Sequence, residues 1–136
     1  MVAAFCRYLF HVEDEMLTEI VMAVCLHTAL ACSDIAISFT DFPVRRSAAS
    51  LYNSEVQAQA YMTNYGNLGI WFDEKYRDVD AGSTEALQLA THEVAHLIVF
   101  KLDPRASDHG STFQRICREL SKKVGVNAQV TCRAEG

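Results

Sequence analysis

The sequence contains little that would interrupt or disorder a folded chain, because only two of its 136 residues are proline and six are glycine. Half of the residues are hydrophobic and 21% are charged. This composition excludes a disordered tail, a collagen-like fibre and a low-complexity linker. A chain of this length forms one domain, which we assign to residues 1–136.

Basic side chains are also in short supply. Lys and Arg number 12 against 17 Asp and Glu, so the formal net charge is −5. A surface of this sign repels phosphate overall. Residues 91–136 differ, with seven basic and five acidic side chains. We therefore expect any contact with a polyanion to involve the C-terminal third.

The five cysteines include no CxxC pair, and their number is odd. Both facts argue against a disulfide framework and against a four-cysteine zinc ribbon. We see no secretory signal, so we expect reduced, packed thiols in a cytoplasmic protein. The apolar stretch 16–32 contains Glu19 and His27 and falls short of the roughly 20 apolar residues of a membrane span. It predicts a buried helix rather than a signal peptide or a transmembrane segment.

Hydrophobic periodicity predicts a mixed order of helices and strands. Apolar residues at helical spacing indicate a helix over about 14–31, and alternation indicates a strand at 35–39. Two further alternating runs flank a turn signal, so 56–72 is typical of a β-hairpin. Helices are then expected over 84–102 and from 111 to about 123.

The helix over 84–102 has the clearest boundaries. Ser83 is a good N-cap, Glu85 lies in the positive first turn, and Lys101 lies in the last turn. Apolar residues occupy two opposite arcs of this helix, which predicts burial on two sides. The segment 111–114, Ser-Thr-Phe-Gln, matches a capping box for the last helix.

The central helix carries the pattern HExxH. His92 and His96 stand one turn apart on one face, so both imidazoles can reach the same ion. Glu93 sits at the edge of that face, where it can contact a water on the metal. Zinc acts as a Lewis acid and lowers the pKa of its water to about 7, while the glutamate takes the proton.

A catalytic zinc needs a third protein ligand and one open position. His109 is the better candidate because it follows the helix after a short loop, beside Gly110, whose backbone can turn tightly. Glu119 on the last helix is the alternative ligand. Three acidic residues are candidates to orient a ligand histidine through its other ring nitrogen: Asp73, Asp80 and Asp108.

HExxH at 92–96 followed by HGxxF at 109–113 resembles the SprT-like (Spartan-type) zinc metallopeptidases. The order of elements is also similar over about residues 30–123. The resemblance implies an α+β minimal zincin fold. In that fold a small antiparallel sheet packs against an N-terminal helix and the HExxH helix, and a C-terminal helix follows.

The resemblance also implies a site. His92, His96 and His109 would bind one Zn²⁺ per chain, and Glu93 would act as general base and acid. The implied activity is cleavage of protein substrates, which in the best-known members are bound or crosslinked to DNA. An edge strand in such folds pairs with the substrate backbone, and the predicted hairpin is a candidate for it.

Our interpretation is therefore a zinc-dependent endopeptidase with a protein substrate and no membrane partner. No C-terminal zinc ribbon is expected in this chain, so we expect DNA binding by the chain alone to be weak. The alternative is a noncatalytic zinc-stabilised adaptor that binds protein or DNA, with Cys117 as a candidate fourth ligand. Glu93 favours the enzyme, since a purely structural site does not need a carboxylate there.

Overall fold

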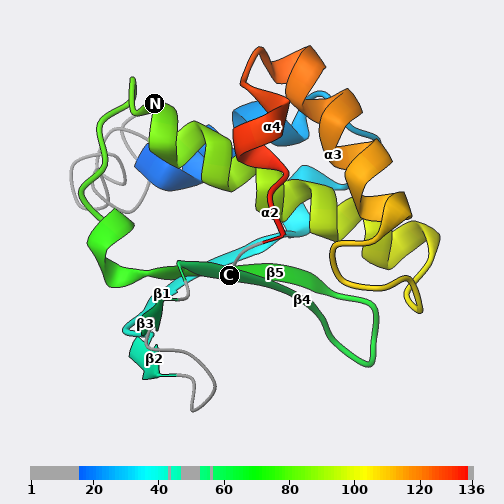
Figure 1. Ribbon diagram of the computed structural model, residues 1–136, viewed down its shortest axis with the longest axis horizontal. Coiled ribbons are helices and arrows are strands. Elements are labelled where there is room, and N and C mark those ends of the chain that lie inside the picture. The colour runs from blue at the N-terminus through cyan, green and yellow to red at the C-terminus, as the bar shows by residue number, and fades with distance from the viewer. Residues whose placement is uncertain (1–15, 43, 47–52, 56, 135–136) are drawn as a thin grey trace, which may run out of the picture.

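The computed structural model describes residues 16–42, 44–46, 53–55 and 57–134 (Figure 1). Its helical elements are a helix over 16–25, the 3₁₀ helices η1 (Cys32–Asp34) and η2 (Glu74–Tyr76), and the helices α2 (Thr84–Leu102), α3 (Ser111–Val124) and α4 (Ala128–Thr131). Its strands are β1 (Ala36–Thr40), β2 (Val44–Arg46), β3 (Asn53–Glu55), β4 (Ala58–Met62) and β5 (Leu68–Asp73). The expected α+β class is confirmed.

A three-stranded sheet in the order β1-β5-β4 forms one layer of the fold. Strands β4 and β5 form the predicted hairpin, closed by a turn in which Gly66 has a φ of 84°. The expectation of an antiparallel sheet is wrong for one pairing, because β1 runs parallel to β5. After β1 the chain runs through β2 and β3 and then along the edge strand β4. It turns back into β5, which occupies the centre of the sheet and runs in the same direction as β1.

Helix α2 lies between the sheet and the helices α3 and α4 (Figure 1). Its apolar arcs are buried on both sides, as the sequence predicts. The start is also as expected, because the Ser83 hydroxyl accepts a hydrogen bond from the backbone N–H of Ala86 at 3.1 Å. The core around α2 contains side chains from the N-terminal helix, the sheet, α2 and α3. Those that are fully buried include Leu17, Val21, Ile70, Phe72, Val94, Leu97 and Phe113.

The N-terminal helix ends earlier than predicted, at residue 25 rather than near 31. The Thr28 hydroxyl donates to the backbone carbonyl of Cys25 at 2.6 Å and accepts from the backbone N–H of Leu30 at 3.1 Å. These local bonds compete with continued helix. A disulfide between Cys25 and Cys32 also closes this turn. The predicted start near residue 14 lies outside the described residues.

The expectation of reduced thiols is wrong for four of the five cysteines. Cys25 is bonded to Cys32, and Cys117 on α3 is bonded to Cys132, which follows α4. Cys6 lies outside the described residues. Sequence spacing did not indicate these pairs, because each depends on how the chain folds back on itself. Disulfides of this kind are typical of oxidising environments.

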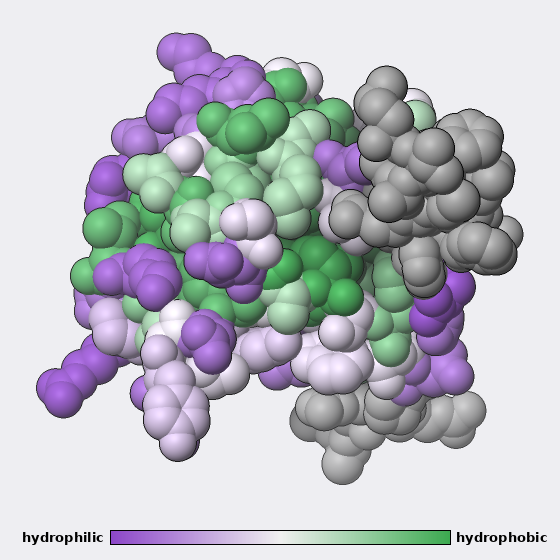
Figure 2. Space-filling view, turned by 180° about the vertical axis from the view of Figure 1, so that it is seen from behind, coloured by the Kyte–Doolittle hydropathy of each residue, from purple (hydrophilic) through white to green (hydrophobic). Residues whose placement is uncertain are grey.

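The surface is apolar in the middle of the face seen from behind, between polar margins (Figure 2). Among the described residues, Leu26 is 80% exposed and Leu102 is 67% exposed. In the described part of the chain, no helix is both long enough and apolar enough to cross a membrane.

Candidate metal centre

Three histidine side chains meet where α2 faces the start of α3. Helix α2 supplies His92 and His96, and the loop between α2 and α3 supplies His109. The Nε2 atom of His92 lies 3.2 Å from that of His96 and 3.2 Å from that of His109, and the third Nε2–Nε2 distance is 3.1 Å. The structure therefore brings together the three residues that the sequence singled out.

The ring of His92 is held by the backbone of α4. Its Nδ1 lies 2.7 Å from the carbonyl oxygen of Thr131. A carbonyl only accepts, so Nδ1 carries the hydrogen and donates it. Burial lowers the pKa of His92, which keeps the ring neutral. Its Nε2 therefore presents a lone pair to the other two rings.

The other two rings face the carboxylate of Asp108. Its oxygens lie 3.7 Å from Nδ1 of His96 and 3.4 Å from Nδ1 of His109. A carboxylate beside Nδ1 favours a hydrogen on that nitrogen and leaves Nε2 free to bind a metal. Burial, and then the neighbouring His92, lower the pKa of His96 to about 4.

Of the three acidic candidates, Asp108 is the one that faces the histidines. Asp73 has a different task, since its carboxylate accepts from the backbone N–H of Lys75 at the start of η2 and from that of Phe42. Asp80 contributes its backbone carbonyl, which accepts from the N–H of Ser83 just before α2.

The cluster fits a tetrahedral metal ion. Three lone pairs that face one another at about 3 Å repel unless a cation lies between them. Zinc–nitrogen bonds of 2.0–2.1 Å at tetrahedral angles place the nitrogens about 3.3 Å apart, close to the observed separations. Imidazole ligands suit zinc among the first-row metals. The three histidines are thus positioned to bind a metal ion such as zinc.

The ring of Phe113 packs against all three histidine rings. This fully buried ring lies 5.0 Å from the ring of His92, 4.2 Å from that of His96 and 5.0 Å from that of His109, centroid to centroid. Gly110 precedes it as the N-cap of α3, and a Cβ there would lie 2.2 Å from the Ser107 hydroxyl oxygen. The HGxxF motif therefore combines a ligand, a close approach of the loop and an apolar support.

The predicted capping box at 111–114 is not formed. Helix α3 begins at Ser111 itself, its N-cap is Gly110, and no side chain caps it. Gln114 points elsewhere, because its side-chain amide donates to the backbone carbonyls of His109 and Cys132.

Glu93 lies beside the histidines and is only 5% exposed. Its carboxyl accepts a hydrogen bond from the backbone N–H of Ala60 on β4. Burial is the larger effect and raises the pKa of Glu93 to about 8. A carboxyl with a raised pKa next to a metal site has the character of a general base and acid.

A cleft of about 270 Å³ opens directly onto His92 and Glu93. The lining comes from the edge strand β4 with the preceding Gln57, from α4 with Arg133, and from helix α2. The metal centre therefore has an accessible side next to its buried carboxylate.

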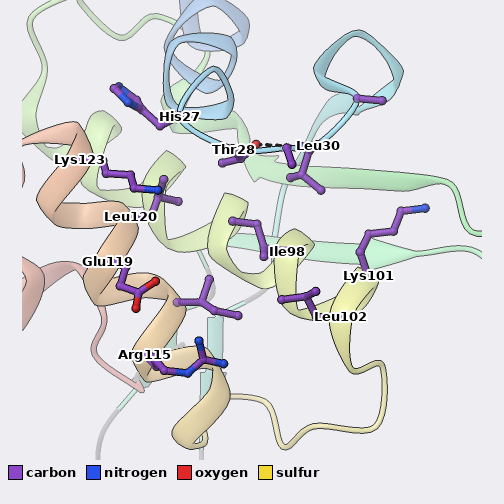
Figure 3. A pocket seen from close by; sticks show the side chains of 13 residues that line it. His27, Thr28, Leu30, Ile98, Lys101, Leu102, Arg115, Glu119, Leu120 and Lys123 are labelled. Atoms are coloured by element: carbon purple, nitrogen blue, oxygen red, sulfur yellow. Dashed lines mark hydrogen bonds between the residues drawn. The ribbon is translucent and has the colours of Figure 1, made fainter.

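Two other ligand candidates lie outside this cluster. Glu119 is exposed on α3 and lines a separate pocket of about 520 Å³ together with His27 and Lys123 (Figure 3). Cys117 is bonded to Cys132, so it has no thiolate to offer. Two groups near the histidines were not predicted from the sequence, the Thr131 carbonyl and the Gln114 amide. A backbone carbonyl has no side-chain signal, so no sequence pattern could have indicated that of Thr131.

Comparison with known families agrees with this geometry. A model of the SprT-like family matches residues 40–133, which include all three histidines, Glu93 and most of the fold. The chain belongs to the SprT-like family. No curated protein and no solved structure matches the chain.

Proposed function

We propose that this chain is a zinc-dependent endopeptidase, with His92, His96 and His109 as the metal ligands and Glu93 as the catalytic carboxylate. The main support for this proposal is that three histidine Nε2 atoms lie within 3.1–3.2 Å of one another, beside a buried glutamate that borders a cleft. Membership of the SprT-like family supports the same class of activity.

When bound, zinc supplies a Lewis acid and lowers the pKa of a water that it binds to about 7. The other tasks belong to the chain. Glu93 accepts a proton from the attacking water and returns it to the leaving amine. The backbone N–H of Ala60 orients the carboxylate for this work. Burial keeps Glu93 basic enough to take the proton.

The substrate class follows from the exposed edge of the sheet. β4 is an outer strand in the order β1-β5-β4. The carbonyl of Gln57 and the N–H of Thr63 bond towards the β5 side, so the alternate residues Ala58 and Ala60 direct their backbone groups outwards. The Ala60 N–H is bonded to Glu93, which leaves the Ala60 carbonyl and the backbone groups of Ala58 to pair with an added strand. Ala58 also lines the cleft. An extended polypeptide that pairs with this edge would pass Glu93, with affinity from main-chain bonds and little sequence preference.

The alternative of a noncatalytic adaptor no longer has a candidate fourth zinc ligand. A structural zinc site closes its fourth position with a protein ligand, and Cys117, the candidate for that position, is consumed by a disulfide. Among the described residues, the histidine cluster contains three ligands and no fourth. A noncatalytic site would also have no use for the buried Glu93.

DNA association of this chain alone is expected to be weak and lost as salt rises, because the net charge is −5. Submicromolar binding at physiological salt would contradict this, and charge reversal at Lys122 and Lys123 would then locate the contact. The cytoplasmic location stays a prediction, and the reduced thiols that were expected with it are not found at Cys25, Cys32, Cys117 and Cys132.

Chelation tests the proposed activity. We expect the purified protein to contain one zinc per chain, to cleave casein, to lose cleavage on treatment with a chelator and to regain it with added zinc. Cleavage that persists in chelated, zinc-free protein would contradict the proposal, and so would zinc-loaded protein that fails to cleave any unfolded protein substrate.

A further inference from the structure

Gln114 on α3 joins two segments that both reach the histidine cluster. Its side-chain amide nitrogen lies 2.8 Å from the carbonyl oxygen of Cys132 and 3.4 Å from that of His109. An amide NH₂ group has two hydrogens, so it can donate to both carbonyls at once. One side chain thus connects the backbone of the third ligand to the segment that follows α4.

That segment also holds the ring of His92. The carbonyl of Thr131, the residue before Cys132, accepts the Nδ1 hydrogen of His92 at 2.7 Å. Helix α4 has only four residues, Ala128–Thr131, and a helix this short is not stable by itself. Its position must come from contacts with the rest of the fold. At its C-terminal end these include the Cys117–Cys132 disulfide, the Gln114 amide and the Ser121 hydroxyl, 3.6 Å from Cys132 Sγ.

We propose that Gln114 is a positioning residue for the metal centre, acting with the Cys117–Cys132 disulfide as a clasp between α3 and α4. This inference rests on the proposed function, since it concerns the same zinc site. The clasp holds the Thr131 carbonyl against His92 and the His109 backbone against α3. All three Nε2 lone pairs then point to one place before any metal binds.

The expected size of the effect follows from this arrangement. Without the clasp, His92 loses the acceptor that fixes its tautomer and ring angle, and the loop with His109 gains freedom. Loss of such outer contacts typically weakens metal affinity 10- to 100-fold. Thr131 and Arg133 also form a wall of the cleft, so the same clasp shapes the substrate side of the site.

The first test replaces the amide by an apolar group of similar length. We expect Gln114→Met to weaken zinc binding about 10- to 100-fold, measured by competition with a chromophoric chelator. The visible absorption spectrum of the Co²⁺-loaded variant should also change, since the ligand geometry is altered. Gln129→Met is the matched control, because Gln129 is exposed on α4, and it should retain both the affinity and the spectrum. Thermal unfolding of the metal-free proteins verifies that each variant is folded.

The second test removes the covalent part and stands even if Gln114→Met does not fold. We expect Cys117→Ser/Cys132→Ser to weaken zinc binding at least about tenfold. The matched control, Cys25→Ser/Cys32→Ser, deletes the other disulfide, which closes the turn after the N-terminal helix, and should leave zinc affinity unchanged.

The outcomes separate this inference from the proposed function. Wild-type affinity and an unchanged Co²⁺ spectrum in Gln114→Met would overturn the clasp while leaving the zinc site intact. Equal weakening by both disulfide deletions would also overturn it, because the effect would then be one of general stability. A wild-type protein that binds no zinc would contradict the proposed function itself.

Discussion

The ring of Phe113 stacks on the ring of His96, with centroids 4.2 Å apart and planes inclined by 26°. Phe113 is fully buried and also touches the other two histidine rings. The side chain that opens α3 is therefore both part of the core and the apolar backing of the metal centre.

Truncation of this ring should destabilise the fold. We expect Phe113→Ala to lower the free energy of unfolding by about 3–5 kcal/mol, the usual cost of emptying a buried phenylalanine site. Denaturant unfolding of the metal-free protein measures this. Phe100→Ala is the control, since Phe100 is half-buried and its ring lies 6.4 Å from that of His96. An equal loss of unfolding free energy in both variants would contradict the role of Phe113 as a core side chain.

The ligand set can be separated by one pair of substitutions. We expect His109→Ala to weaken zinc binding sharply, because it removes one of three convergent Nε2 atoms. Glu119→Gln should leave zinc stoichiometry and peptidase activity nearly unchanged, because Glu119 lines a different pocket. Metal analysis after gel filtration gives both results. One zinc per chain retained in the first variant and lost in the second would move the third ligand to the glutamate.

The disulfides predict a definite thiol count. Protein purified without reductant and then denatured should react with an alkylating reagent at no more than one cysteine per chain, because four of its five cysteines are paired. Reduction before alkylation should expose all five. Mass spectrometry of the labelled chain reads this directly. Five labelled cysteines without reductant would contradict both disulfides.

Local signals were enough to predict much of the site. The spacing of His92, Glu93 and His96 fixes their common face on any helix, and Ser83 marks where that helix begins. For this reason the predicted range 84–102 agrees with α2, Thr84–Leu102. The hairpin of β4 and β5 was predictable for the same reason, since alternation and a turn are properties of adjacent residues.

Features set by distant parts of the chain were not predictable in this way. The parallel pairing of β1 with β5 depends on the path through β2, β3 and β4. The bond between Cys117 and Cys132 depends on the turn after α3, where Gly125 takes a φ of 93°. The acceptor of the His92 hydrogen is a backbone carbonyl, which every residue possesses. Sequence patterns do not distinguish one such carbonyl from another.

The most direct test of the metallopeptidase assignment is the rate of casein cleavage by zinc-loaded Glu93→Gln. The amide keeps the size of the side chain but cannot accept the proton of the attacking water. We expect zinc content and unfolding temperature close to those of the wild type, with Glu119→Gln as an active control. Loss of a general base typically costs 10²–10⁴-fold in rate, and we expect a loss of about that size. If Glu93→Gln cleaves casein as fast as the wild type, Glu93 is not the catalytic carboxylate and the proposed mechanism is wrong.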